Sequence, residues 1–143
     1  MYSVSPGIFT QTATGSGTGA IANSDGTLNT SANPATAGSI VTIYMTGQGY
    51  ITGMPSDGNI SNTALQTPYT PTVFIVGDPN PVPPANIKYS GLAPTLVGVW
   101  QINVQIPNDT ISLPTVPVQV FVQVNGLVSG GGGLGRPVYI YVK

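Results

Sequence analysis

The chain has 143 residues, of which only 5% are charged, whereas about 25% are charged in typical domains. It contains three Lys or Arg residues, four Asp, and no Glu, His or Cys, and its net charge is -1. These numbers exclude a basic surface for nucleic acid and a disulfide framework. No apolar run approaches the ~20 residues of a membrane span, so we expect no membrane insertion. A nearly neutral surface favours association, and the length predicts a single domain over residues 1–143.

The N-terminal third predicts short strands that lead into one clear strand. Residues 4–10, which contain Pro6-Gly7, predict an interrupted edge strand, and the composition of residues 12–19 predicts a loop. We therefore expect residues 1–19 to form an edge strand followed by a loop. Asp25-Gly26 lies between two short apolar runs and predicts a small hairpin. Residues 40–45 alternate between two faces and are followed by Gly47 and Gly49, which indicates a central strand of a β-sandwich.

The middle of the chain alternates between turn-rich segments and strands. Residues 56–68 are polar and predict a loop, and residues 71–77 predict a strand. Residues 78–84 include four prolines and favour extended, polyproline-like geometry. Residues 86–89 then predict a short strand that ends at Ser90-Gly91.

The C-terminal part contains the cleanest alternation. In residues 97–106 the even positions, Trp100 among them, form the expected core face. We expect residues 98–106 to lie across the core from residues 38–50, with Trp100 between them. Residues 116–124 predict another strand, followed by an Asn125-Gly126 type I′ turn. Residues 126–136 form a glycine-rich connection to a last strand at 137–143, which carries Tyr139 and Tyr141 on one face and apolar residues on the other. Such a strand is either central in its sheet, which is the expected arrangement, or covered by something else.

The chain therefore predicts an all-β fold of eight or nine strands with no helix. Strands of 5 to 10 residues separated by Pro, Gly and Asn turns are typical of an antiparallel β-sandwich.

Few residues in this sequence could carry chemistry. Without His, Cys or Glu, hydrolysis would depend on four Asp residues, and all four lie in turn contexts, so we expect no enzyme and no cofactor. The glycine patterns at residues 15–20 and 130–135 resemble dinucleotide-binding loops, but no helical pattern follows either of them. Asp57-Gly58-Asn59 fits a weak calcium site, although an Asx turn is the commoner use of such a segment. The sequons at Asn29, Asn59 and Asn108 would permit glycosylation.

An ordered set of segments resembles a known family. The segments are SPGIFT (5–10), DGTLN (25–29), NPA (33–35), GSIVTIY (38–44), TGQG (46–49), YSGLAP (89–94) and GVWQINVQIP (98–107). Together they resemble the Solibacter-type C-terminal domain of large secreted acidobacterial proteins, which is similar to the IPT/TIG branch of immunoglobulin-like domains. The resemblance covers nearly the whole chain and implies an immunoglobulin-like sandwich, export to the cell surface or medium, and a non-catalytic accessory role. The sequence departs from the family at residues 127–136, where residues 130–133 are unusually glycine-rich.

Two functions follow as expectations. The first is a structural or interaction module that binds protein partners, including copies of itself, in a surface assembly or filament with strand exchange. Ile8 and Phe9 in the first strand and Tyr139 and Tyr141 in the last are the residues expected to take part in strand exchange.

The alternative is a carbohydrate-binding accessory module. In it, the loop tyrosines Tyr50, Tyr69 and Tyr89 would stack on a polysaccharide, because aromatic rings at strand ends and in loops suit such contacts.

Overall fold

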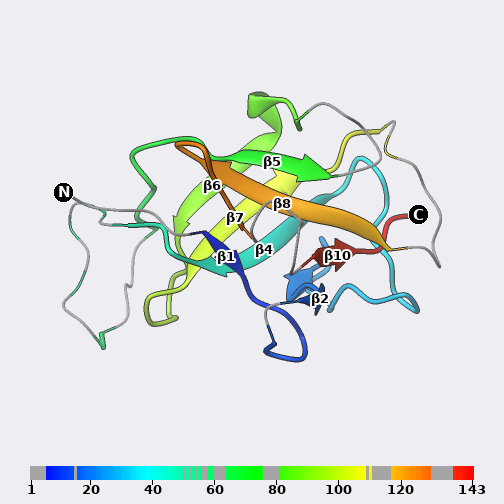
Figure 1. Cartoon of the computed structure of the whole chain (residues 1–143), viewed down its shortest axis with the longest axis horizontal. Coiled ribbons are helices and arrows are strands. Elements are labelled where there is room, and N and C mark those ends of the chain that lie inside the picture. The colour runs from blue at the N-terminus through cyan, green and yellow to red at the C-terminus, as the bar shows by residue number, and fades with distance from the viewer. Residues whose placement is uncertain are drawn as a thin grey trace.

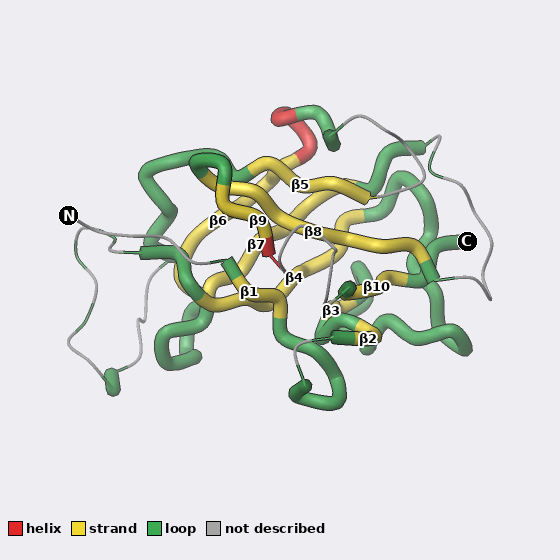
Figure 2. The backbone as a smooth tube through the Cα atoms, viewed as in Figure 1, coloured by secondary structure: helices red, strands yellow, loops and turns green. Residues whose placement is uncertain are grey.

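The structure, a computed structural model, describes residues 6–14, 16–49, 51, 53, 55, 58–59, 64–75, 81–108, 110, 117–129 and 137–143. In this part of the chain two five-stranded sheets pack face to face, so the predicted all-β sandwich is confirmed. In Figure 1, β8 of one sheet crosses in front of β4 and β7 of the other. Loops lie at both ends of the strands (Figure 2).

The first sheet is ordered β1-β4-β7-β6, with β3 also paired to β4. Its strands are β1 (Gly7–Ile8), β3 (Ile21–Ala22), β4 (Ile40–Thr46), β6 (Ile87–Leu92) and β7 (Trp100–Gln105). β1 and β3 share one edge of β4, with Ile8 opposite Met45 and Ile21 opposite Ile43. All strand pairs in this sheet are antiparallel.

The second sheet is ordered β2-β10-β8-β5, with β9 also paired to β8. Its strands are β2 (Gly17–Thr18), β5 (Thr72–Ile75), β8 (Val118–Val124), β9 (Leu127–Val128) and β10 (Val138–Ile140). β10 lies between β8 and β2, as expected for a central last strand. It runs parallel to β2, and Ala35 pairs in parallel with Val142, so the expectation of a wholly antiparallel sandwich is wrong at this end.

The core lies between the two sheets and is built from alternate residues of each long strand. β4 contributes Val41, Ile43 and Met45, and all three are completely buried. β7 contributes Trp100, whose side chain is the largest in the core, with Ile102 and Val104. β8 and β10 bury their Val and Ile residues from the other side. The predicted core face of residues 97–106 is therefore confirmed from Trp100 onward.

The prediction about the partner of β4 is wrong. β7 lies beside β4 in the same sheet, with Val41 opposite Val104 and Met45 opposite Trp100. Both strands alternate buried and outward residues, and that alternation is the same for hydrogen-bonded neighbours and for strands that face each other across a core. Alternation identifies the buried face but not the partner.

Three local predictions are corrected as well. Residues 17–18, expected in a loop, form β2, which pairs with β10. The strand expected to end at Ser90-Gly91 continues to Leu92 and pairs with β7 along this length. Gly91 lies against Leu65, where a Cβ on residue 91 would clash with the Leu65 carbonyl oxygen. Pro84–Asn86 forms a short 3-10 helix in a segment for which no helix was expected.

Two turn predictions are confirmed. Asn125 and Gly126 both have positive φ, at 51° and 79°, as a type I′ turn requires, and they join β8 to β9. In the first hairpin, Ala22 bridges to Leu28, and Gly26 has a φ of 84°. The glycine-rich residues 130–133 and the start of the chain at residues 1–5 lie outside the described residues.

Candidate functional site

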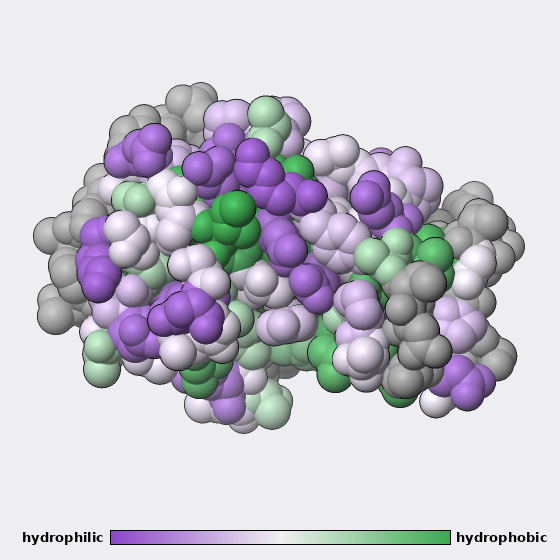
Figure 3. All heavy atoms as spheres, turned by 180° about the vertical axis from the view of Figure 1, so that it is seen from behind, coloured by the Kyte–Doolittle hydropathy of each residue, from purple (hydrophilic) through white to green (hydrophobic). Residues whose placement is uncertain are grey.

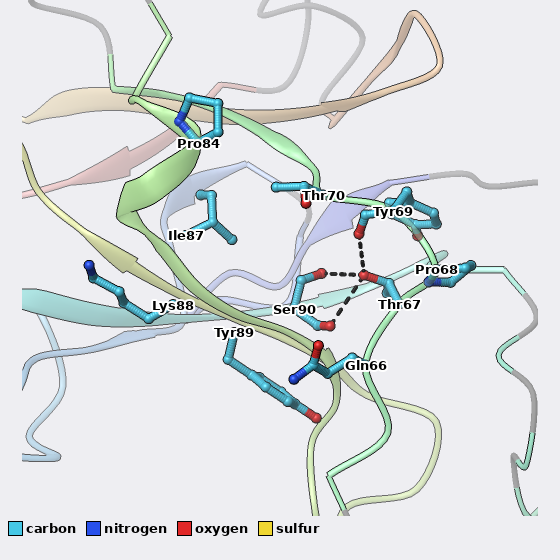
Figure 4. Close-up of a pocket in the computed structure, with 10 residues that line it drawn as sticks. All are labelled: Gln66, Thr67, Pro68, Tyr69, Thr70, Pro84, Ile87, Lys88, Tyr89 and Ser90. Atoms are coloured by element: carbon cyan, nitrogen blue, oxygen red, sulfur yellow. Dashed lines mark hydrogen bonds between the residues drawn. The ribbon is translucent and has the colours of Figure 1, made fainter.

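Two of the loop tyrosines, Tyr69 and Tyr89, line one hollow of about 310 Å³ beside β6. Figure 4 shows its walls, which come from residues 66–70 and from the segment between Pro84 and Ser90. Tyr50, the third tyrosine, lies outside the described residues. The structure thus brings together two of the three tyrosines that the sequence suggested as partner or glycan contacts.

A buried hydroxyl network fixes the floor of this hollow. The Thr67 and Ser90 hydroxyls lie 2.8 Å apart, and the Trp100 indole N–H donates to Ser90 Oγ at 2.9 Å. Thr67 Oγ1 also donates to the Tyr69 carbonyl at 2.7 Å (Figure 4). Each polar group here has a partner inside the protein, so the network holds residues 67–69 against β6 and leaves little hydrogen-bonding capacity for a ligand.

The Tyr69 side chain is partly buried and packs against the core. Its ring meets Trp100 edge to face with centroids 6.0 Å apart, and its hydroxyl donates to the Gln48 carbonyl at 2.5 Å. Burial raises the pKa of Tyr69 to about 12. The ring is partly buried against the core, so Tyr69 offers only part of its surface to a ligand in the hollow.

Tyr89 keeps a more open position. Its hydroxyl donates to the Leu92 carbonyl at 2.6 Å, and partial burial raises the pKa of Tyr89. The register of β6 and β7 places Tyr89 beside Asn103, on the outer face of the first sheet. Tyr89 therefore offers a ring at the surface, with its hydroxyl already satisfied.

Asp25 is the only Asp in the part of the chain that the structure describes. No group of three or more His, Cys, Asp or Glu side chains lies together there. Asp25 accepts hydrogen bonds from the Thr27 hydroxyl at 2.5 Å and from the Thr27 N–H at 3.0 Å, and these bonds lower the pKa of the Asp25 carboxyl. This is the turn role predicted for Asp25. The other three aspartates, Asp57, Asp78 and Asp109, lie outside the described residues. The suggested calcium site depends on Asp57, so its carboxylate lies outside them as well.

The residues proposed for strand exchange lie in different sheets. Ile8 is in β1 of the first sheet and belongs to the core, at 5% exposure, whereas the neighbouring Phe9 is 40% exposed. Phe9 lines a mainly apolar hollow of about 590 Å³. Tyr139 and Tyr141 are partly exposed at the C-terminal end of the chain, and Tyr139 lies on β10 opposite Gln119 of β8.

The outer face of the second sheet gathers aromatic rings that the sequence pattern did not connect. Phe74 of β5 lies opposite Phe121 of β8, and the two rings stack with centroids 4.6 Å apart and an interplanar angle of 14°. Both side chains are partly exposed. Their alternate positions are visible in the sequence of two predicted strands, but only the register brings them face to face.

Asn29 has a different role from the one that its sequon suggests. The sequon would permit glycosylation, yet the Asn29 side chain is completely buried. The amide donates to Asn23 Oδ1 at 3.0 Å and to the Tyr141 carbonyl at 2.8 Å, and Asn29 Oδ1 accepts from the Tyr141 N–H at 2.8 Å. The folded protein leaves no room for a glycan on Asn29, whose role is to anchor the last residues of the chain.

Comparisons with models of protein families, with curated proteins and with solved structures find no match to this chain. The resemblance to the Solibacter-type C-terminal domain, and with it the immunoglobulin-like identity of the sandwich, therefore stays a prediction. Among the described residues, no helix is long and apolar enough to cross a membrane.

Proposed function

We propose that this chain is a non-catalytic interaction module of an exported bacterial protein and that it associates with copies of itself through the second sheet. The observation that carries the proposal is the stacked pair Phe74 and Phe121 on the outer face of that sheet. Aromatic rings that remain partly exposed on a sheet face are typical of protein–protein contacts. The exported location rests on the family resemblance alone.

The neighbouring positions extend this aromatic face. Tyr139 of β10 lies opposite Gln119 of β8. Phe121 is two residues further along β8, so Tyr139, Gln119 and Phe121 all point to the same side of the sheet. None of the side chains at these outward positions of β5, β8 and β10 is charged. The face is thus an aromatic strip with amide side chains around it, the composition expected at the centre of an interface.

Charge favours a second copy of the chain as the partner. Two molecules that each carry a net charge of -1 repel each other only weakly. A net charge this close to zero promotes association between copies of a protein. The strands β2, β10, β8 and β5 have 2, 3, 7 and 4 residues. At about 3.3 Å per residue and about 4.8 Å between strands, they give a face of roughly 250 Å². This is below the ~800 Å² that each partner contributes to a standard interface, so we expect weak association through this face alone.

Strand exchange is the stronger form of the same proposal. In it, β10 of one copy would pair with β8 of another and carry Tyr139 and Tyr141 with it. The strand is held in its own chain by its pairing with β8 and by the bonds of Tyr141 to Asn29. Exchange must break these bonds before they form again in the partner, so exchanged dimers would form and separate slowly.

Sedimentation velocity over a wide concentration range tests the proposal. We expect the average mass of the wild-type chain to rise with concentration and Phe121→Lys to remain monomeric. Leu96→Lys is the matched control, because Leu96 is an exposed apolar residue, at 44%, in the loop before β7. Circular dichroism verifies that both variants are folded.

Three outcomes would contradict parts of the proposal. A wild-type chain that stays monomeric at millimolar concentration rules out self-association. Equal association of Phe121→Lys and the wild type rules out the aromatic face. Dimers of Phe121→Lys that dissociate only slowly on dilution would assign the contact to strand exchange instead.

A further inference from the structure

The outer face of the first sheet places two tyrosines on either side of a pair of amide side chains. Tyr44 of β4 lies opposite Gln101 of β7, and Asn103 of β7 lies opposite Tyr89 of β6. All four residues are partly exposed. Since β7 separates β4 from β6, the two tyrosine-bearing strands are about 10 Å apart.

Two adjoining hollows meet at Tyr44. One has a volume of about 250 Å³ and the other of about 450 Å³, and both are lined by Tyr44, Ala22 and Gly26. Leu28 in the smaller hollow is 50% exposed, and Ile40 in the larger one is 40% exposed. The Tyr44 ring thus stands in a groove between the first hairpin and β4, with apolar surface at both ends.

The amide side chains in this groove have hydrogen-bonding capacity left over. Asn103 Oδ1 accepts from Thr42 Oγ1 at 3.1 Å and from Gln101 Nε2 at 3.0 Å, which fixes the orientation of the Asn103 amide. Within the described residues, no acceptor receives the Asn103 Nδ2 hydrogens, although Asn103 lines the larger hollow. The Tyr44 hydroxyl likewise has no hydrogen-bond partner in that part of the chain. Such groups bind a ligand that carries hydroxyl oxygens.

Charge restricts the class of ligand. None of the described residues lining the two hollows is charged. The nearby Asp25 carboxylate in the hairpin turn accepts hydrogen bonds from Thr27, and it does not itself line either hollow. Seen from behind, hydrophilic residues cover most of the surface, and the hydrophobic ones form small, separate groups (Figure 3). A groove with no cationic side chain in its lining offers no attraction to an anionic ligand, and the single exposed carboxylate nearby attracts a cation only weakly.

We propose that this groove binds a neutral polysaccharide, with one sugar ring on Tyr44. Sugar rings present an apolar face of C–H groups that packs on an aromatic ring, and their hydroxyls match the free amide hydrogens of Asn103. A chain that continues across β7 reaches Tyr89, whose ring lies along β6 where Gly91 has no side chain. The site lies on the opposite sheet from the self-association face and does not depend on it.

Tyr44 and Tyr69 differ in how much of the ring and hydroxyl is left for a ligand. The Tyr69 ring is partly buried against Trp100, and its hydroxyl is bonded to the Gln48 carbonyl. Tyr44 instead lies within a strand with its hydroxyl unoccupied by any described residue, so a ligand gains both a stacking surface and a hydrogen bond there.

Affinity electrophoresis of the full chain in gels containing mixed-linkage β-glucan, xylan or mannan tests the site. We expect at least one of these neutral polymers to retard the wild type, and the anionic polymer alginate not to. Tyr44→Ala should weaken that retardation about tenfold, the equivalent of about 1.4 kcal/mol. Leu96→Ala is the matched control, because Leu96 is an exposed apolar residue, at 44%, that lines neither hollow and lies outside the self-association face, and this variant should bind as the wild type does.

Two further variants separate stacking from folding. Tyr44→Phe keeps the ring and should retain more binding than Tyr44→Ala, and Asn103→Leu should weaken binding while thermal unfolding shows a folded protein. Binding unchanged in Tyr44→Ala, or no retardation by any neutral polymer, overturns the proposal. Tyr44-dependent binding of a proline-rich peptide without saccharide binding would also overturn it and assign the groove to a protein ligand.

Discussion

Asn29→Ala should destabilise the fold more than any substitution of an exposed asparagine. Asn29 is completely buried, and its amide joins the first hairpin to the last residues of the chain, through Asn23 and Tyr141. Alanine removes the amide that makes this link. The Tyr141 carbonyl still accepts from the Ala35 N–H at 2.9 Å, whereas the Tyr141 N–H and Asn23 Oδ1 lose their hydrogen bonds to Asn29.

The magnitude follows from these two groups. A buried polar group without a partner costs about 1–3 kcal/mol, so two of them reduce the free energy of unfolding by about 2–6 kcal/mol. A domain of this size is stable by about 5–15 kcal/mol, so the loss is a large fraction of the total. With a urea m-value of about 2 kcal/mol/M, the unfolding midpoint falls by about 1–3 M. Urea unfolding followed by tryptophan fluorescence measures it, since Trp100 lies in the core.

Asn33→Ala is the matched control for this prediction. Asn33 also makes two side-chain hydrogen bonds, to Thr27 Oγ1 at 2.7 Å and to the Leu28 carbonyl at 3.1 Å, but it is exposed. Water can replace its partners, so we expect a loss of about 0.5–1 kcal/mol. If both variants unfold at the same urea concentration, the reasoning from burial is refuted.

Three further predictions concern stability. The pKa of Tyr69 is raised to about 12 in the folded protein, from an ordinary value of 10. The contribution of the protonated Tyr69 hydroxyl to the free energy of unfolding is therefore complete below pH 10 and is lost as the pH rises toward 12. Urea midpoints should fall over this pH range in the wild type and fall less steeply in Tyr69→Phe. Gly91→Ala should lower the thermal midpoint, because its Cβ would clash with the Leu65 carbonyl, whereas Gly7→Ala should not, since its Cβ has only an ordinary 3.5 Å contact; equal midpoints would contradict this. Gly126→Ala, at a φ of 79°, should cost about 1 kcal/mol in urea unfolding, and a neutral result would show that the turn rearranges.

The sequence is sufficient for the features that depend on neighbouring residues. Asn125-Gly126 predicts its turn because few other residue pairs adopt positive φ at both positions. The alternation around Trp100 predicts the buried face of β7, because successive side chains of a strand point to opposite sides. The scarcity of charge also limits the function classes, because residue counts do not depend on how the chain folds.

Other features depend on which strands become neighbours, and local patterns do not specify that. β2 has only two residues and a loop-like composition, and it is a strand because β10 supplies its hydrogen bonds. The stacking of Phe74 on Phe121 needs the register of β5 and β8, and the Tyr44 groove needs the first hairpin to fold beside β4.

The candidate sites show the same division. The sequence points to tyrosines by their position in loops, but their availability depends on burial and on hydrogen-bond partners. Tyr69 meets that loop criterion, but its ring packs against Trp100 and its hydroxyl is bonded to Gln48. Tyr44 has the pattern of an ordinary strand residue, yet it lines a groove with no described partner for its hydroxyl. Residue type and spacing alone establish the all-β fold, the buried faces and the near absence of charge. Which outward side chains share a surface is established by the folded chain, because it depends on pairing between segments far apart in the sequence.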